Sequence, residues 1–130
     1  MPDTQSDSLL DVLAAYRSLS DALPLSVLFK DTAGRRTFAN RHYCEMHRVA
    51  PEAVIGKTDF DLFSSEYAQV FRSGDERTLR TGYYAQHERF PTENRGEDRL
   101  IYVVKRRTCD SSGKSTGTHG ICFDVSKGSM

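Results

Sequence analysis

The sequence lacks the features that mark several common classes of protein. Its 18 Lys and Arg residues balance 18 Asp and Glu residues, so no net charge would attract nucleic acid or an anionic membrane. No apolar run approaches the roughly 20 residues of a membrane-spanning helix, and the first residues lack the basic start and apolar middle of a signal peptide. We therefore expect a cytoplasmic protein with no membrane span and no direct nucleic-acid partner.

Cysteine is also scarce, and its placement argues against a metal site. Cys44, Cys109 and Cys122 are an odd number without metal-ligand spacing, so we expect free thiols. The four histidines contain no His-x-x-x-His pair that would support zinc. At 130 residues the chain fits one domain with one modest core, and no metal is expected.

The first 22 residues divide into a polar segment and an amphipathic helix. Residues 1–7 are polar and are expected to be disordered, whereas residues 8–22 alternate apolar spacings of three and four. Ser8 is placed to cap this helix. The apolar stripe consists of Leu9, Val12, Tyr16, Leu19 and Leu23. It either packs on its own domain or meets a second copy of the chain, and we favour a homodimer.

Residues 23–126 contain the signals of a compact α+β domain. Apolar alternation and turn residues predict a hairpin of strands 25–30 and 35–39, then short helices beginning at Asn40 and Pro51. A longer helix is predicted over 64–79, with Ser64 as its cap, followed by strands 83–90, 99–107 and 115–125. We expect turns at 93–96 and 110–113. Five antiparallel strands with helices on one face define the expected architecture.

Three stretches carry a resemblance to a known family. They are the hairpin from Phe29 to Asn40, the segment from Gly56 to Phe63, and the last turn and strand, which ends in Asp124-Val125-Ser126. This order resembles a PAS domain, a sensory and signalling family, over about four-fifths of the chain. The closing triplet departs slightly from the usual Asp-Ile-Thr of that family.

The resemblance implies a fold and a role. The fold would be a five-stranded antiparallel sheet with short helices on one face and an amphipathic N-terminal helix. The role would be a sensory module in bacterial-type signal transduction or transcriptional regulation, which binds a small molecule and relays the change to an effector in cis or in trans. The output would be a kinase, a cyclase or a DNA-binding domain. By resemblance, Asp124, Val125 and Ser126 form the relay, and residues 127–130 begin a linker or end the chain.

A ligand site is expected in the space between the curved sheet and the helices. Alternation and helical spacing place apolar side chains there, and His42, Tyr43, Tyr84 and His87 could orient a small molecule, together with Lys105 and Arg106. The other expected lining residues are Val27, Phe29, Phe38, Met46, Phe60, Phe63, Phe71, Tyr102, Val104 and Ile121. A shift of the strand faces by one residue would change this set.

The sequence gives less support to a bound cofactor or a catalytic role than to a ligand site. Cys44 lacks the sequence context of flavin-binding members of the family, and the helix over 64–79 has no His to hold haem, so neither cofactor is expected. Cys44 and His47 could meet on one helix face, but no orienting acid can be assigned to them. Two alternatives stay open beside the sensor: a ligand-free interaction or dimerisation module, and a small α+β enzyme using Cys44 or His87. We expect that the protein is not an enzyme.

Acidic residues gather in the sequence around one predicted turn. They are Glu88, Glu93, Glu97 and Asp98. On the rim of a hairpin such residues usually form a solvated edge, and we expect that here rather than an acid and base pair.

Overall fold

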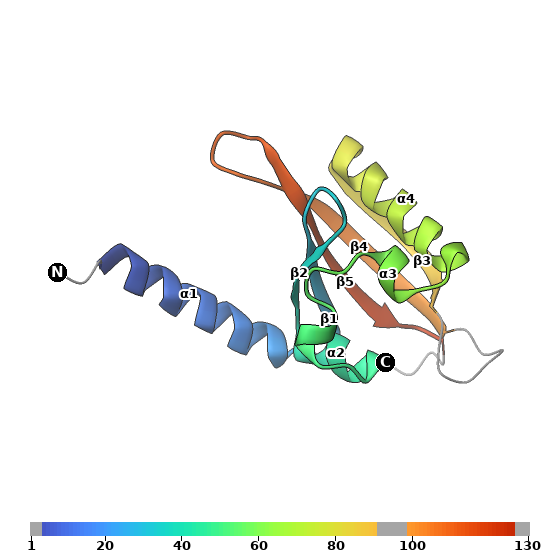
Figure 1. Cartoon of the computed structure of the whole chain (residues 1–130), viewed down its shortest axis with the longest axis horizontal. Helices are drawn as coiled ribbons and strands as arrows, with labels where there is room; N and C mark the ends of the chain where they lie inside the picture. The colour runs from blue at the N-terminus through green and yellow to red at the C-terminus, as the bar shows by residue number, and fades with distance from the viewer. Residues whose placement is uncertain (1–3, 91–98, 127–130) are drawn as a thin grey trace.

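The computed structural model describes residues 4–90 and 99–126, with side chains described from residue 8 onward. Figure 1 shows the order of the elements along the chain. They are α1 (Thr4–Asp21), β1 (Ser26–Lys30), β2 (Arg36–Ala39), α2 (Arg41–His47), a short 3-10 helix η1 (Pro51–Ala53), α3 (Asp59–Leu62), α4 (Ser65–Thr81), β3 (Tyr83–Phe90), β4 (Arg99–Cys109) and β5 (Ser115–Asp124).

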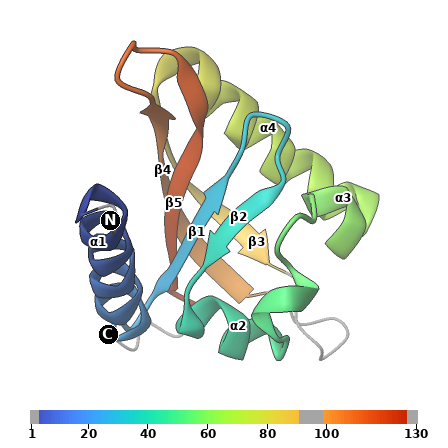
Figure 2. The same ribbon diagram turned by 60° about the vertical axis from the view of Figure 1, so that its left-hand side comes forward.

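The five strands form one antiparallel sheet in the order β2-β1-β5-β4-β3. The last strand, β5, lies in the middle, between β1 and β4, so the two ends of the domain meet at the centre of the sheet. Figure 2 shows α1 on one side of the sheet and α3 and α4 on the other. The expected α+β architecture is confirmed. Within the described part of the chain, no helix is long and apolar enough to cross a membrane.

Two turns form as their residues predict. The carboxylate of Asp31 accepts hydrogen bonds from the backbone N–H groups of Ala33 and Arg35, each at 2.9 Å, and Gly34 takes the left-handed φ of 88°. Asp110 orders the turn between β4 and β5 in the same way. The third expected turn, at 93–96, and residues 127–130 lie outside the described residues.

Asn40 joins α1, β1 and α2. Its side-chain oxygen accepts from the backbone N–H groups of Val27 at 3.0 Å and Tyr43 at 3.1 Å, so it caps α2 as expected. Its side-chain nitrogen donates to the carbonyls of Ser20 at 2.7 Å and Leu25 at 2.9 Å. Asn40 is fully buried, and all four bonds replace contacts with water that burial removes.

The start of the first helix and the capping of α4 differ from the predictions. Helix α1 begins at Thr4, four residues before Ser8, so residues 4–7 are helical where disorder was expected. Ser64 stands at the N-cap of α4, but its side chain makes no capping bond. The capping box forms instead one helix earlier, where Thr58 and Asp61 bond each other's backbone N–H groups at the start of α3.

The apolar stripe of α1 divides between the domain and solvent. Tyr16 packs on the outer face of the sheet, with ring centroids 5.6 Å from Phe29 and 5.4 Å from Phe38. The rest of the stripe is exposed: Leu9 61%, Val12 63%, Leu19 65% and Leu23 37%. Tyr16 therefore fixes α1 to its own domain, and the expected dimer surface consists of the leucines and the valine.

Candidate functional site

A cavity lies between the inner face of the sheet and helices α2 to α4, with an open volume of about 60 Å³. All five strands contribute to its walls, β2 through Arg36. Its apolar walls include Leu28, Phe63, Phe71, Phe90, Ile101 and Val103. The polar groups at its edge include Lys30, Arg36, Tyr43, Asp59, Glu88 and Lys105. An apolar hollow with a few convergent polar groups is the usual form of a small-molecule site.

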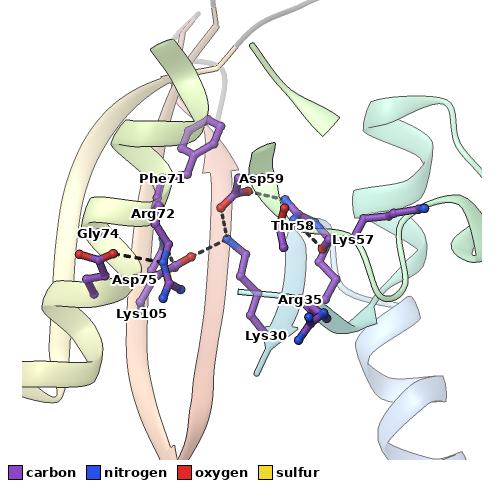
Figure 3. A network of polar contacts seen from close by, with 12 residues as sticks. Lys30, Arg35, Lys57, Thr58, Asp59, Phe71, Arg72, Gly74, Asp75 and Lys105 are labelled. Carbon is purple, nitrogen blue, oxygen red and sulfur yellow. Dashed lines mark hydrogen bonds and ion pairs between the residues drawn. The ribbon is translucent and has the colours of Figure 1, made fainter. Parts of the chain in front are cut away.

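A network of buried ion pairs borders this cavity (Figure 3). Lys30 Nζ lies 2.8 Å from both Asp59 Oδ2 and Asp75 Oδ2. Arg36 Nη2 donates to Asp59 Oδ1 and Lys105 Nζ to Asp75 Oδ1, each at 2.6 Å. All five side chains are less than a tenth exposed. The network therefore ties strands β1, β2 and β4 to helices α3 and α4.

The charges in the network hold one another in the ionised form. Burial alone would raise the pKa of Asp75, but the positive charges and hydrogen bonds of Lys30 and Lys105 outweigh it and lower that pKa. Arg36 also donates through Nε to the hydroxyl of Tyr43 at 3.1 Å. Removing Asp59 or Asp75 would leave buried cations without compensation, which costs far more free energy than the intact pairs contribute.

Glu88 and Tyr84 form a second polar pair beside Lys105. The hydroxyl of Tyr84 donates to Glu88 Oε2, and burial raises the pKa of both groups. The ring centroid of Tyr84 lies 5.5 Å from Lys105 Nζ. Gly74 of α4 makes room for this arrangement, because a Cβ there would lie 3.0 Å from Tyr84 Cζ. Glu88 is 5% exposed, so the expectation of a solvated acidic edge is wrong for this residue.

Several of the predicted ligand residues do border the cavity. Tyr43, Phe63, Phe71 and Ile121 are among the lining residues. Met46 packs against the apolar cluster of Phe71 and Phe90 that forms one wall. Tyr43 and Met46 on α2 and Phe71 on α4 follow from the helical spacing that the sequence indicates, and Phe63 directly follows α3. Ile121 pairs with Val27 and Val104 in the sheet, so strand alternation does not account for its place at the cavity.

The face assignment of the strands is off by one residue. Strand pairing puts Phe29 opposite His119, and His87 opposite Tyr102, and their rings pack together on the face away from the cavity. Alternation places the whole set on that outer face: Val27, Phe29, Phe38, His87, Tyr102 and Val104. The reason is that both faces carry apolar side chains, and the inner face also carries charges.

Three other predicted residues have different surroundings from those expected. Phe60 is 52% exposed and is not among the residues that line the cavity. The Nδ1 atom of His42 lies 3.0 Å from the hydroxyl of Ser26, which lines the cavity, so His42 touches the site only through that residue. Arg106 lies over the ring of Tyr83 at 5.7 Å, on the outer face.

The sequence reasoning missed the charged part of the site. Lys30, Arg36, Asp59, Asp75 and Glu88 were not predicted as site residues, yet all are buried. A usable signal existed on α4, where Asp75 lies four residues after Phe71 and three before Thr78, within the buried stripe of that helix. A carboxylate in such a stripe requires a buried partner.

The residues weighed for catalysis do not form an activated group. Burial raises the pKa of the Cys44 thiol, which disfavours the reactive thiolate. Burial and nearby Arg36 lower the pKa of His47 to about 4, and its ring packs against Tyr43. His87 lies on the outer face. Over residues 4–90 and 99–126, no group of three or more His, Cys, Asp or Glu side chains is placed to hold a metal ion.

Comparison with known protein families identifies the family to which this fold belongs. Residues 20–128 match the PAS fold family, so the chain belongs to that family. A chain of "Uncharacterized protein y4lL" from Sinorhizobium fredii is 28% identical over 116 residues, which cover 89% of this chain and 14% of that protein.

Solved structures give the same result. VqmA bound to DPO superposes with a TM-score of 0.74 at 27% identity, covering 85% of this chain and 56% of that one. The Vibrio cholerae VqmA complex with ligand and DNA gives 0.73 at 28% identity, covering 82% and 48%. A PAS domain from Colwellia psychrerythraea gives 0.74 at 16% identity, covering 89% and 98%, and shows the shared fold. This chain therefore spans about half the length of the VqmA chains.

Proposed function

We propose that the chain is a sensory domain that binds a small molecule in the cavity between the sheet and helices α2 to α4. The observation that supports this most is the position of the buried network. Lys30 and Lys105 border an apolar hollow, and each contributes an ammonium group with hydrogen-bonding capacity for a guest. Buried ionised groups contribute little net stability, so their position beside an open cavity favours a role in binding over a role in stability alone.

The similar proteins suggest the type of output. VqmA was solved bound to DPO and in a complex with ligand and DNA, and it is described among LuxR-type receptors. By analogy, ligand binding in this chain would control transcription through an effector in cis or in trans. A DNA-binding output would place the protein in the cytoplasm.

The relay would run through the end of β5. Gly120 and Cys122 line the cavity on this strand, and Asp124 follows two residues later. Asp124 Oδ2 accepts from Arg99 at 2.6 Å, and Ser126 Oγ accepts from the backbone N–H of Leu100 at 2.6 Å. These contacts bind the exit of the domain to the start of β4. A shift of β5 on ligand binding would therefore reach the exit.

Homodimerisation through α1 is the second part of the proposal. Leu9, Leu10, Val12, Leu13 and Leu19 are each more than half exposed. Several large apolar side chains on one exposed helix favour burial against a partner. A second copy of the chain offers the same surface and would bury it by two-fold symmetry.

A thermal-shift screen tests the ligand part. A panel of small metabolites should contain a compound that stabilises the chain by about 2.7 kcal/mol at a hundredfold excess over its dissociation constant. Gly120→Val should remove that response, because a Cβ at Gly120 meets only ordinary contacts, the nearest being Lys105 Cγ at 3.5 Å, and the larger side chain fills the cavity. Thr116→Val, on the exposed part of β5, is the matched control and should keep it. A panel without a hit would favour the ligand-free interaction module.

A further inference from the structure

The buried network contains more positive than negative groups. Its ion pairs run in the order Lys105, Asp75, Lys30, Asp59, Arg36, with each carboxylate shared between two cations. Three positive groups therefore face two negative ones. Because all five are buried, solvent screens the excess positive charge poorly, and a further negative charge at the cavity would be stabilised.

Glu88 is the other buried acid at the cavity, and it lies outside this chain of ion pairs. Its oxygen accepts from Tyr84, and within the described residues it forms no salt bridge. The charged and titratable groups that act on it are Tyr84 of β3, Lys105 of β4, Asp75 of α4 and Lys30 of β1. Burial is the largest influence on its pKa and raises it, so protonation of Glu88 is easier than for an exposed carboxylate.

Both lysines border the cavity, and neither uses all three ammonium protons in strong hydrogen bonds. Lys105 Nζ donates to Asp75 Oδ1 at 2.6 Å and only weakly to the carbonyl of Phe71 at 3.4 Å. Lys30 Nζ uses two of its three protons, on Asp59 and Asp75. An acceptor atom of a guest would find at least one charged donor on each lysine, and charge-assisted bonds of this kind are the strong ones.

The size and walls of the cavity limit the guest. A water needs about 10–15 Å³ of such space, so about 60 Å³ suits a molecule of roughly four to six non-hydrogen atoms. Beyond Ser26 and the polar groups already named at its edge, the walls are apolar, including Phe71, Phe90, Ile101 and Val103. A guest with one charged end and a short apolar tail satisfies both regions.

We infer that the cavity binds a small organic monoanion, a carboxylate with a short apolar tail, which takes the place of the Glu88 charge beside Lys105. This inference rests on the proposed function, because it names the ligand class of the same cavity. As the anion binds, the Glu88 carboxylate takes up one proton from solvent and becomes a neutral acid. The total charge of the buried site is then the same before and after binding.

Propionate is a suitable probe, with propionamide as its uncharged counterpart of the same shape. Both are titrated into the 130-residue chain by NMR, at about pH 6 and about pH 8. Propionate should bind at least tenfold more tightly than propionamide, and its affinity should rise as the pH falls, because Glu88 must take up a proton. Equal affinities for the two compounds would overturn the inference.

Two variants separate the roles of the charged groups. Glu88→Gln should bind propionate at least as tightly as the wild type and should lose the pH dependence, because the neutral side chain needs no proton. Lys105→Met should weaken propionate binding at least tenfold while leaving propionamide binding almost unchanged. Loss of propionate binding in Glu88→Gln, with the fold intact by circular dichroism, would contradict the assigned role of Glu88. If Lys105→Met does not fold, the comparison of propionate with propionamide and the Glu88→Gln result still show whether the cavity binds a carboxylate in place of the Glu88 charge.

The same experiments distinguish this inference from the proposed function. If a neutral compound of the metabolite panel binds, Gly120→Val blocks it, and propionate does not bind, the ligand class is wrong and the sensory cavity stands. If neither carboxylates nor neutral compounds bind the wild type, both are wrong.

Discussion

The ammonium of Lys105 on β4 lies 2.6 Å from the carboxylate of Asp75 on α4, and the two side chains are at most 9% exposed. This contact joins β4, next to the central strand, to the long helix at the cavity. Lys30 binds the other oxygen of Asp75 and extends the link to β1. Lys30 and Lys105, which border the cavity, therefore also hold the two layers together through Asp75.

Asp75→Asn should destabilise the domain severely. It removes the negative charge between Lys30 and Lys105 and leaves a buried ammonium without compensation, which costs about 3–5 kcal/mol in comparable cases. Glu76→Gln, at the next and mostly exposed position, is the control and should stay within about 0.5 kcal/mol. Urea unfolding measures both. A loss below about 1 kcal/mol for Asp75→Asn would show that the network contributes little.

His47 should make the fold sensitive to acid. Its folded pKa is about 4 and its ordinary value is 6.5, so the unfolded chain binds more protons. Its contribution is complete above about pH 6.5 and falls as the pH drops toward 4, by about 2–3 kcal/mol at about pH 4.5. His47→Phe keeps an aromatic ring against Tyr43 and Phe90 and should remove this loss.

Urea unfolding of the wild type and His47→Phe at about pH 7 and about pH 4.5 isolates that effect. Burial also lowers the pKa of His119 and raises that of Glu88, but both groups are present in the two proteins and cancel in the comparison. Parallel pH profiles for the two proteins would contradict the assignment to His47.

The exposed face of α1 should determine the oligomeric state. Replacing Leu9, Val12 and Leu19 with Gln puts a good helix former at each position and removes the apolar area. Light scattering should then report a monomer where the wild type is a dimer. Ser18→Gln, on the same helix, should leave the dimer intact. A wild type that is monomeric at high concentration would rule out this interface.

Asp124→Ala should separate stability from signalling. Asp124 is 28% exposed, and its bonds to Arg99 and to the backbone of Ser126 should contribute only on the order of 1 kcal/mol. In a protein that contains the effector, the variant should keep its ligand affinity and melting temperature while the response to ligand becomes smaller. An unchanged response would show that this position is an ordinary strand end.

The sequence predicts the architecture well because turns and caps are local. The turn bonds of Asp31 with Gly34, and the cap that Asn40 forms on Tyr43, act within a few positions along the chain. The positions of α1 and α4 along the chain follow in the same way from the helical spacing of their apolar residues. The family resemblance, now confirmed, rests on the order of these local signals.

The candidate site depends on contacts that the sequence does not display. Lys30 is 29 residues from Asp59 and 45 from Asp75, and only the pairing of β1 with β5 and the placement of α4 bring them together. Hydrophobic alternation also favoured the wrong face of the strands. Phe29 and Tyr102 look like core residues, whereas the true inner positions include Lys30 and Lys105. Those two lysines become compatible with burial through their ion pairs with Asp59 and Asp75.

Native mass spectrometry of the purified chain tests the central claim most directly. A cavity that binds a small molecule predicts a bound species of low mass on the wild type, or on the wild type after incubation with the stabilising compound, and no such species on Gly120→Val. The same bound mass on both proteins, or none on the wild type under either condition, would contradict the account of this cavity as a ligand site.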